Sequence, residues 1–266
     1  MILGAVVRRL FAGLTGLILL FLYLPLALVV VNSFNTSRSF AWPPTGFTLE
    51  WWRRAWESEG ARDAVVTSVQ VALAATMIAL VLGTVLSLAL QRHAFFGKSS
   101  VNLLVVLPIA LPGIVTGIAL NNAFRGVLGI ELSILTIIVA HATFCIVTVF
   151  NNVQARLRRM GGSLEEASAD LGAGVWTTFR LVTFPQLRSA LLAGGLLAFA
   201  LSFDEIIVTT FTAGAGTTTL PIWILNNLFR PNQAPVVNVV AVVLIALSII
   251  PIWIAQRLSG DTETLK

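Results

Sequence analysis

The chain has 266 residues, of which 57% are hydrophobic and only 11% charged, and its mean hydropathy is +0.90. A soluble domain carries about 25% charged residues, so this composition excludes an ordinary soluble fold and favours an integral membrane protein. The formal net charge is +5, but the basic residues are scattered between apolar segments, so we expect no nucleic-acid partner. The single cysteine excludes an internal disulfide framework.

Six apolar segments are long enough to cross a bilayer as helices, which requires about 20 residues each. They cover residues 10–31, 64–90, 101–120, 132–150, 189–208 and 236–255. Only two charged side chains, Asp204 and Glu205, fall within them. No small-x-small cleavage site follows the first segment before Asn32, so we expect that segment to be retained. The sequence therefore predicts an all-α integral membrane protein, a single transmembrane domain of six helices over residues 1–266.

The distribution of positive charge predicts the orientation of these helices. Of the 17 Lys and Arg residues, 11 lie in the two termini and in the connections that share their side, and 6 lie in the alternate connections. Positive residues concentrate on the cytoplasmic side of a membrane protein. We therefore expect both termini to be cytoplasmic.

The third predicted helix is interrupted by Pro108, Pro112 and Gly113. Proline removes a backbone hydrogen bond and bends a helix, and broken helices at membrane depth are tolerated where they line protein or a water-filled path. The segment is therefore a candidate wall of a translocation pathway. Gly113 and Gly117 also form a small-xxx-small pair that would let another helix approach closely, and helix packing alone explains the glycines equally well.

Residues 151–188 form the longest predicted inner connection. A capping box, with Ser163 followed by Glu166 three residues later, predicts a short helix, and Gly172 is expected to end it. A second short helix is expected to end before Pro185, which leads into the fifth span. The first of these helices would present acidic side chains on the cytoplasmic face.

A spaced motif in this connection resembles the EAA loop of permease subunits in ABC importers. The matching residues are Glu166-Ala167-Ser168, Gly172, Val182 and Phe184-Pro185. The resemblance implies that residues 161–185 form a coupling loop that docks in a cleft of a separate ATP-hydrolysing subunit. Glu166 would serve equally as a capping residue, and the two roles are compatible. The residues that we assign to ATPase coupling are Glu165, Glu166, Ala167, Ser168, Asp170 and Gly172.

The resemblance extends over nearly the whole chain to permeases of the spermidine/putrescine type. It implies the type I ABC importer permease fold in a bacterial cell membrane, contacting lipid, with a pathway shared with a second permease subunit, expected to be a different chain. The other implied partners are an ABC ATPase dimer, which would bind ATP and Mg, and an extracytoplasmic substrate-binding protein; this chain needs no cofactor of its own. Permeases for iron, phosphonates or other organic cations look similar and remain alternatives for the substrate.

The two acids of the fifth span are the candidate substrate site. An acid within a span costs roughly 2.5 to 3.5 kcal/mol on insertion scales, so it requires compensation. One hypothesis is that Asp204 and Glu205 bind an ammonium group of a polyamine. The alternative is an ion pair with Arg125 or Arg230, or exposure to interfacial water. The other candidate pathway residues are Phe203 and Trp223, as cation–π faces, and Pro112.

Other functions find little support in the sequence. The chain has no catalytic nucleophile, metal cluster or acid/base pair beyond the two acids, so we expect no enzyme. His93 and His141 lack clustered ligands, and His141 is expected to be a hydrogen-bonded packing residue. Gly97-Lys98-Ser99 lacks the earlier glycine of a phosphate-binding loop. A secondary transporter is a weaker alternative, because the two halves of the chain show no convincing repeat.

Overall fold

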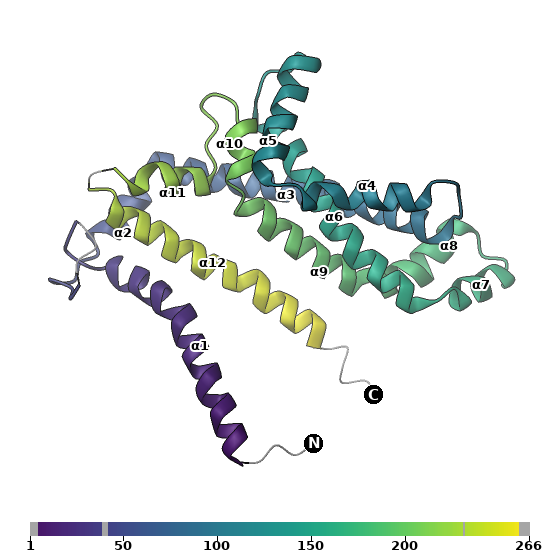
Figure 1. Ribbon diagram of the computed structural model, residues 1–266, viewed down its shortest axis with the longest axis horizontal. Helices are drawn as coiled ribbons and strands as arrows, with labels where there is room; N and C mark the ends of the chain where they lie inside the picture. The colour runs from purple at the N-terminus through teal and green to yellow at the C-terminus, as the bar shows by residue number, and fades with distance from the viewer. Residues whose placement is uncertain (1–4, 39–41, 231, 261–266) are drawn as a thin grey trace. The chain divides into compact units, whose positions relative to one another are not determined.

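The computed structural model describes residues 5–38, 42–230 and 232–260, with side chains described through Leu247. The elements of these residues are helices joined by loops, with one isolated β-bridge between Asn35 and Phe47 (Figure 1). The helices are α1 (Ala5–Asn32), α2 (Glu50–Glu57), α3 (Glu59–Arg92), α4 (Lys98–Ala110), α5 (Gly113–Asn121), η1 (Asn122–Val127), α6 (Ile134–Met160), α7 (Ser163–Asp170), α8 (Val175–Thr178), η2 (Phe179–Thr183), α9 (Phe184–Phe203), α10 (Ile207–Thr212), α11 (Leu220–Leu228) and α12 (Ala234–Gly260). Its contacts divide into two units, Met1–Arg62 with Ile224–Ser248, and Asp63–Trp223 with Ile249–Lys266.

The first unit contains α1, whose apolar side chains are exposed almost throughout its length. A turn after α1 is organised by Asn35, whose side chain is buried. Its Oδ1 atom accepts hydrogen bonds from the backbone N–H groups of Ser37 and Thr45, at 3.1 and 3.3 Å, and its carbonyl accepts one from Trp51 Nε1 at 2.8 Å. Trp51 lies in α2 and is 3% exposed, so these bonds attach α2 to the end of α1.

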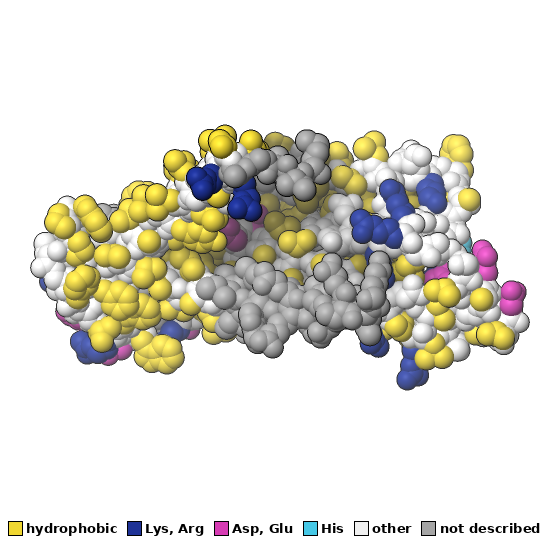
Figure 2. All heavy atoms as spheres, turned by 90° about the horizontal axis from the view of Figure 1, so that it is seen from below, with side chains coloured by type: hydrophobic (Ala, Val, Ile, Leu, Met, Phe, Trp, Pro, Cys, Tyr) yellow, Lys and Arg dark blue, Asp and Glu magenta, His cyan; other side chains and the backbone are white. Residues whose placement is uncertain are grey.

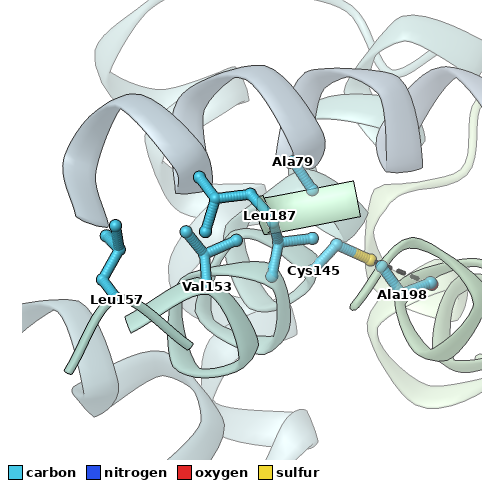
Figure 3. Packing of buried hydrophobic residues seen from close by; sticks show 7 residues of the cluster. Ala79, Cys145, Val153, Leu157, Leu187 and Ala198 are labelled. Atoms are coloured by element: carbon cyan, nitrogen blue, oxygen red, sulfur yellow. Dashed lines mark hydrogen bonds between the residues drawn. The ribbon is translucent and has the colours of Figure 1, made fainter. Parts of the chain in front are cut away.

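The second unit is built on α6, which packs against α9 and α3. Buried residues of the three helices form one apolar cluster, which Figure 3 draws. Its members are Ala79, Cys145, Val149, Val153, Leu157, Leu187 and Ala198. Cys145 Sγ donates to the carbonyl of Ala198 at 3.3 Å, so the only cysteine of the sequence is a packing residue.

Small residues let these helices approach closely. A Cβ atom placed on Gly83 of α3 would lie 3.0 Å from the Ile146 carbonyl and 3.1 Å from the Phe150 nitrogen of α6. Ser87, one turn later, donates a hydrogen bond to the Phe150 carbonyl at 3.1 Å. Close backbone approach through small residues, with hydroxyl bonds between helices, is typical of packing in membranes.

Four described helices are long and apolar enough to cross a membrane, and they match the first, second, fourth and fifth predicted spans. The third predicted span corresponds to α4 and α5, which are bent by 103° across Leu111 and Pro112, so the predicted interruption is confirmed there. At Pro108 it is wrong, because α4 continues through this residue to Ala110. The sixth corresponds to α12, whose side chains beyond Leu247 lie outside those described. Exposed hydrophobic side chains, which are expected of such a protein, form many patches on the face drawn in Figure 2.

The predicted boundaries of the fifth span were wrong at both ends. The helix does not stop before Pro185: α8, the π-helical turn η2 and α9 continue into one another from Val175 to Phe203. Pro185 stands in the first turn of α9, directly after the π-helical turn η2, and a local π-helical adjustment of this kind accommodates the hydrogen bond that proline cannot donate. At the other end the helix stops at Phe203, so residues 204–206 are a break before α10.

Gly83→Leu should lower the free energy of unfolding by about 1 to 3 kcal/mol or more, because the added side chain meets backbone atoms of α6. Thermal unfolding of the purified, detergent-solubilised protein measures the effect. Gly13→Leu in α1 is the matched control, because nothing lies within 4 Å of a Cβ at that position. Equal melting temperatures for the two variants would contradict the close approach of α3 and α6.

Candidate functional site

The predicted short helix after Gly162 is present as α7, but its N-terminus differs from the prediction. The N-cap residue is Gly162, with no side-chain capping bond, so Ser163 is the first helical residue and the predicted capping box does not form. The C-terminus agrees with the prediction. Gly172 follows the helix with a φ of +79°, a conformation that glycine adopts without strain. The Gly172 N–H donates to the Ala169 carbonyl at 2.8 Å.

The acidic residues of α7 do not share one environment. Glu165 is directed toward the protein, where it forms an ion pair with Arg92 at the end of α3 and accepts a hydrogen bond from Thr183 Oγ1 at 2.6 Å. Glu166 and Asp170 are exposed, as are Ala167 and Gly172. Of the residues predicted to couple to an ATPase, these four are therefore free to contact another protein.

Ser168 fixes α7 to the next helix. Its hydroxyl lies 2.9 Å from the hydroxyl of Thr178 in α8, within hydrogen-bond distance. The apolar residues around this contact are largely exposed, including Leu171 at 89% and Trp176 at 71%. The segment thus presents acids and apolar side chains together on an exposed surface, which is unusual unless a partner covers it.

The break after α9 places the two intramembrane acids differently from the prediction, which put them within one helix. Asp204 is the C-cap residue of α9 and is exposed. Glu205 follows it in the break, and its Oε1 accepts a hydrogen bond from the Val208 N–H at 2.8 Å. The Glu205 carboxylate therefore satisfies a free donor at the N-terminus of α10, where negative charge is favourable.

The predicted ion-pair alternative finds no support in the second unit. Among the described residues, neither acid forms an ion pair with Arg125 of η1. Arg230 belongs to the other unit. Phe203, at the end of α9, stacks on Phe199 with ring centroids 5.6 Å apart.

The bend at Pro112 lies close to the break in the fifth span. A Cβ atom on Gly113 would stand 3.7 Å from Ile207 Cβ, and one on Gly117 would stand 2.7 Å from the ring of Phe211. The predicted small-xxx-small pair thus contacts α10, which confirms that it permits a close helix approach. The other candidate, Trp223, lies in α11 and is buried.

His141 of α6 holds the two sides of the break together. Its Nδ1 lies 2.8 Å from Ser202 Oγ in α9, and its Nε2 lies 2.8 Å from Thr209 Oγ1 in α10. Thr209 donates its hydroxyl hydrogen to the Glu205 carbonyl, so towards His141 it can only accept a hydrogen bond. Nε2 of His141 therefore carries a hydrogen and donates it to Thr209 Oγ1. The sequence predicted a hydrogen-bonded packing residue at His141, but gave no sign that its partners would flank the acids.

The end of α10 is bonded to other helices as well. Asn121 Nδ2 donates to the Phe211 carbonyl at 2.5 Å, and Thr136 Oγ1 donates to the Thr212 carbonyl at 2.7 Å. Side chains from α5 and α6 therefore satisfy carbonyls that a helix end leaves free. Across residues 5–38, 42–230 and 232–260 the chain forms no group of three or more His, Cys, Asp or Glu side chains suited to a metal ion.

Comparisons with a family model and with known proteins both indicate a transport permease. Residues 79–263 match the family described as the binding-protein-dependent transport system inner membrane component. The chain is 32% identical over 240 residues to the spermidine/putrescine transport system permease protein PotC of Haemophilus influenzae, covering 90% of this chain and 92% of the relative. It is also 32% identical over 250 residues to the putrescine transport system permease protein PotI of Escherichia coli K12, covering 91% and 88%.

Solved structures agree on the fold. A bacterial ABC transporter involved in import of the acidic polysaccharide alginate aligns with a TM-score of 0.72 at 16% identity, covering 98% of this chain and 99% of that one. The MetNI methionine ABC transporter, in an inward facing conformation, aligns with a TM-score of 0.58 at 19% identity, covering 77% and 98%. The chain therefore has the fold of an ABC transporter permease.

His141→Leu should lower the free energy of unfolding by about 1 to 3 kcal/mol for each hydroxyl group left without its buried partner. The midpoint of thermal unfolding of the purified protein measures this loss. His93→Leu is the matched control, because His93 is exposed in the connection after α3. If the two variants unfold at the same temperature, the His141 bonds do not hold α9 and α10 together.

Proposed function

We propose that this chain, which belongs to the family of binding-protein-dependent transport system inner membrane components, forms half of the translocation pathway of an ATP-driven importer. Its relatives are permeases, so the chain is a transport subunit and not an enzyme. A second permease subunit, a different chain, would form the other half in the bacterial cell membrane. An ABC ATPase dimer would bind ATP and Mg, and an extracytoplasmic binding protein would deliver the substrate.

The exposed surface of α7 carries the proposal of ATPase coupling. Glu166, Ala167 and Asp170 are exposed on a short helix whose opposite side is fixed by Glu165 and Ser168. Because α7 is bonded to its neighbours on this side, a force applied by a partner would displace it together with them. It would not unfold or rotate α7 alone. The match of this segment to the EAA motif supports an ATP-hydrolysing subunit as that partner.

We propose polyamines, such as spermidine and putrescine, as the substrate. Two observations support this choice: relatives at 32% identity are named for these compounds, and two carboxylates lie at the break between α9 and α10. A polyamine carries several ammonium groups separated by apolar carbon chains. Asp204 would bind an ammonium group directly, since it is exposed, and the ring of Phe203 would offer a cation–π contact beside it.

Glu205 would contribute negative charge while remaining bonded to α10. Its Oε1 already accepts from Val208, and a carboxylate has further lone pairs available for a cation. The bend at Pro112, which lies next to α10 through Gly113, would form part of the same pathway wall. A relative of Salmonella typhi named as a putative 2-aminoethylphosphonate permease is 28% identical over 244 residues, which makes that amine the most informative competing substrate.

Asp204→Asn should raise the half-saturating polyamine concentration for uptake about tenfold, which corresponds to about 1.4 kcal/mol of lost binding energy. The loss follows from removing the charge while keeping the shape of the side chain. Glu205→Gln retains an oxygen that can accept from Val208, so it should lower uptake without lowering stability. Uptake of radiolabelled spermidine by the assembled transporter, at equal expression, measures both.

Thr210→Ala is the control for these variants, because Thr210 is exposed in α10 and its hydroxyl donates to the Ile206 carbonyl of its own turn. Wild-type uptake kinetics in both acid variants would contradict the proposal that Asp204 and Glu205 bind the ammonium groups of the substrate. If 2-aminoethylphosphonate inhibits the uptake of radiolabelled spermidine and putrescine does not, the polyamine proposal is wrong and 2-aminoethylphosphonate becomes the proposed substrate.

Leu171→Asp should weaken copurification of the chain with its ATPase at least about tenfold, with little effect on stability, because the side chain is 89% exposed at the end of α7. Phe96→Asp is the matched control, a fully exposed apolar residue in the connection between α3 and α4. Affinity purification of the tagged chain with quantification of bound ATPase measures the effect. Undiminished ATPase recovery with Leu171→Asp would contradict docking at α7.

A further inference from the structure

Three side chains from three different elements meet where α3 ends. Arg92, the last residue of α3, forms an ion pair with Glu165 of α7, and its Nη2 donates to Thr183 Oγ1 at 3.0 Å. Thr183 belongs to η2 and donates its hydroxyl hydrogen to Glu165 Oε1 at 2.6 Å. The three groups form a closed triangle, in which the single hydroxyl of Thr183 both accepts and donates.

The triangle is partly shielded from water. The side chains of Arg92 and Glu165 are 30% and 22% exposed, and Thr183 is fully buried. An ion pair in such a position is screened less by salt than an exposed one, and loss of either partner leaves the other charge poorly compensated. In contrast, the pair between Arg53 and Glu57 on α2 has side chains that are 68% and 57% exposed.

The triangle joins α7 to two spans at once, α3 and α9. Arg92 is the cytoplasmic end of α3 in the predicted orientation, and Thr183 is the last residue before α9. The backbone at Thr183 is π-helical, a local widening that occurs often at functional sites and at points where helices adjust. A displacement of α7 would therefore pull on α3 and on the start of α9 through the same oxygen atom of Glu165.

We propose that the Arg92–Glu165–Thr183 triangle transmits the movement of α7 to α3 and α9. This inference rests on the proposed function, since it requires that α7 receive force from an ATPase. Glu165, which the sequence placed among the ATPase contacts, is then an internal anchor, and the docking surface consists of its exposed neighbours. Arg92 is a positioning residue: it touches neither substrate nor ATP, and it acts through Glu165.

If the triangle transmits movement, its loss should separate ATP hydrolysis from transport, two activities that normally vary together. Without it, α7 would still present Glu166, Ala167 and Asp170 to the ATPase, but its movement would no longer reach the spans. ATP hydrolysis and subunit assembly would persist while transport would fall. A residue that merely stabilised the fold would lower assembly, hydrolysis and transport in parallel.

A charge exchange tests the proposal in the full transporter reconstituted in vesicles. Arg92→Glu and Glu165→Arg should each reduce spermidine uptake per ATP hydrolysed at least about tenfold while the ATPase still copurifies. The double variant Arg92→Glu with Glu165→Arg restores the opposite charges, and it should recover a substantial part of the uptake lost by either single variant. Exchange of Arg53 and Glu57, alone and together, is the matched control and should leave the ratio unchanged.

Thr183→Val and Thr183→Ser provide a second test in case the charge variants do not assemble. Valine keeps the volume but removes the hydroxyl, so it should reduce the ratio of uptake to hydrolysis, whereas serine keeps the hydroxyl and should preserve it. Unchanged ratios in both Arg92→Glu and Thr183→Val would overturn the proposal, as would loss of ATPase binding in Glu165→Arg with normal folding. If the wild-type chain itself recovers no ATPase, the proposed function fails rather than this inference.

Discussion

The structure depends on one constraint of the bilayer: backbone polar groups freed at a break in a helix must find partners within the protein. The second unit breaks two helices, at Pro112 and after Phe203, and it brings the breaks together. Asn121 and Thr136 satisfy carbonyls at the end of α10, and Glu205 satisfies an N–H group at its start. The break between α9 and α10 is therefore stabilised by hydrogen bonds at both ends of α10. These bonds let the protein retain two carboxylates there.

The helix that makes this arrangement possible is α6. Near its start Thr136 and His141 bind α10 and the end of α9, and further along it forms the apolar cluster with α3 and α9. Close to its end, Arg156 Nε donates to the Gln186 carbonyl at 2.9 Å, which fixes the start of α9. One helix thus contacts α9 both near the acids and near the start of α9, where η2 and α7 lie close by in the chain.

Much of this arrangement could be predicted from the sequence, because it follows from local chemistry. Runs of about 20 apolar residues predict spans, Pro112 predicts the bend, Gly113 and Gly117 predict a close helix contact, and Gly172 predicts the end of α7. The family also follows from spaced residues between Glu166 and Pro185. Each of these features depends on neighbours in the chain or on a single general property of the bilayer.

The rest depends on contacts between residues far apart in the chain. The break after Phe203 has no proline or glycine to mark it; it depends on bonds from His141, which stands more than sixty residues earlier. The roles of Glu165 and Glu166 could not be separated, because the partner of Glu165 is Arg92. The Ser163 capping box failed because Gly162 took the N-cap position, which the spacing of polar residues alone does not exclude.

The central claim is that α7 passes force from an ATPase to the spans, and disulfide cross-linking in native membranes tests it most directly. Cys145 is the only cysteine and is buried, so Cys145→Ala with Ala167→Cys gives a single reactive thiol on the exposed side of α7. We expect a cross-link from this thiol to a cysteine in the cleft of the ATPase, formed in a yield that changes when ATP is added. Full transport by a variant whose introduced thiol is freely alkylated in every nucleotide state, and never joins the ATPase, would contradict the claim.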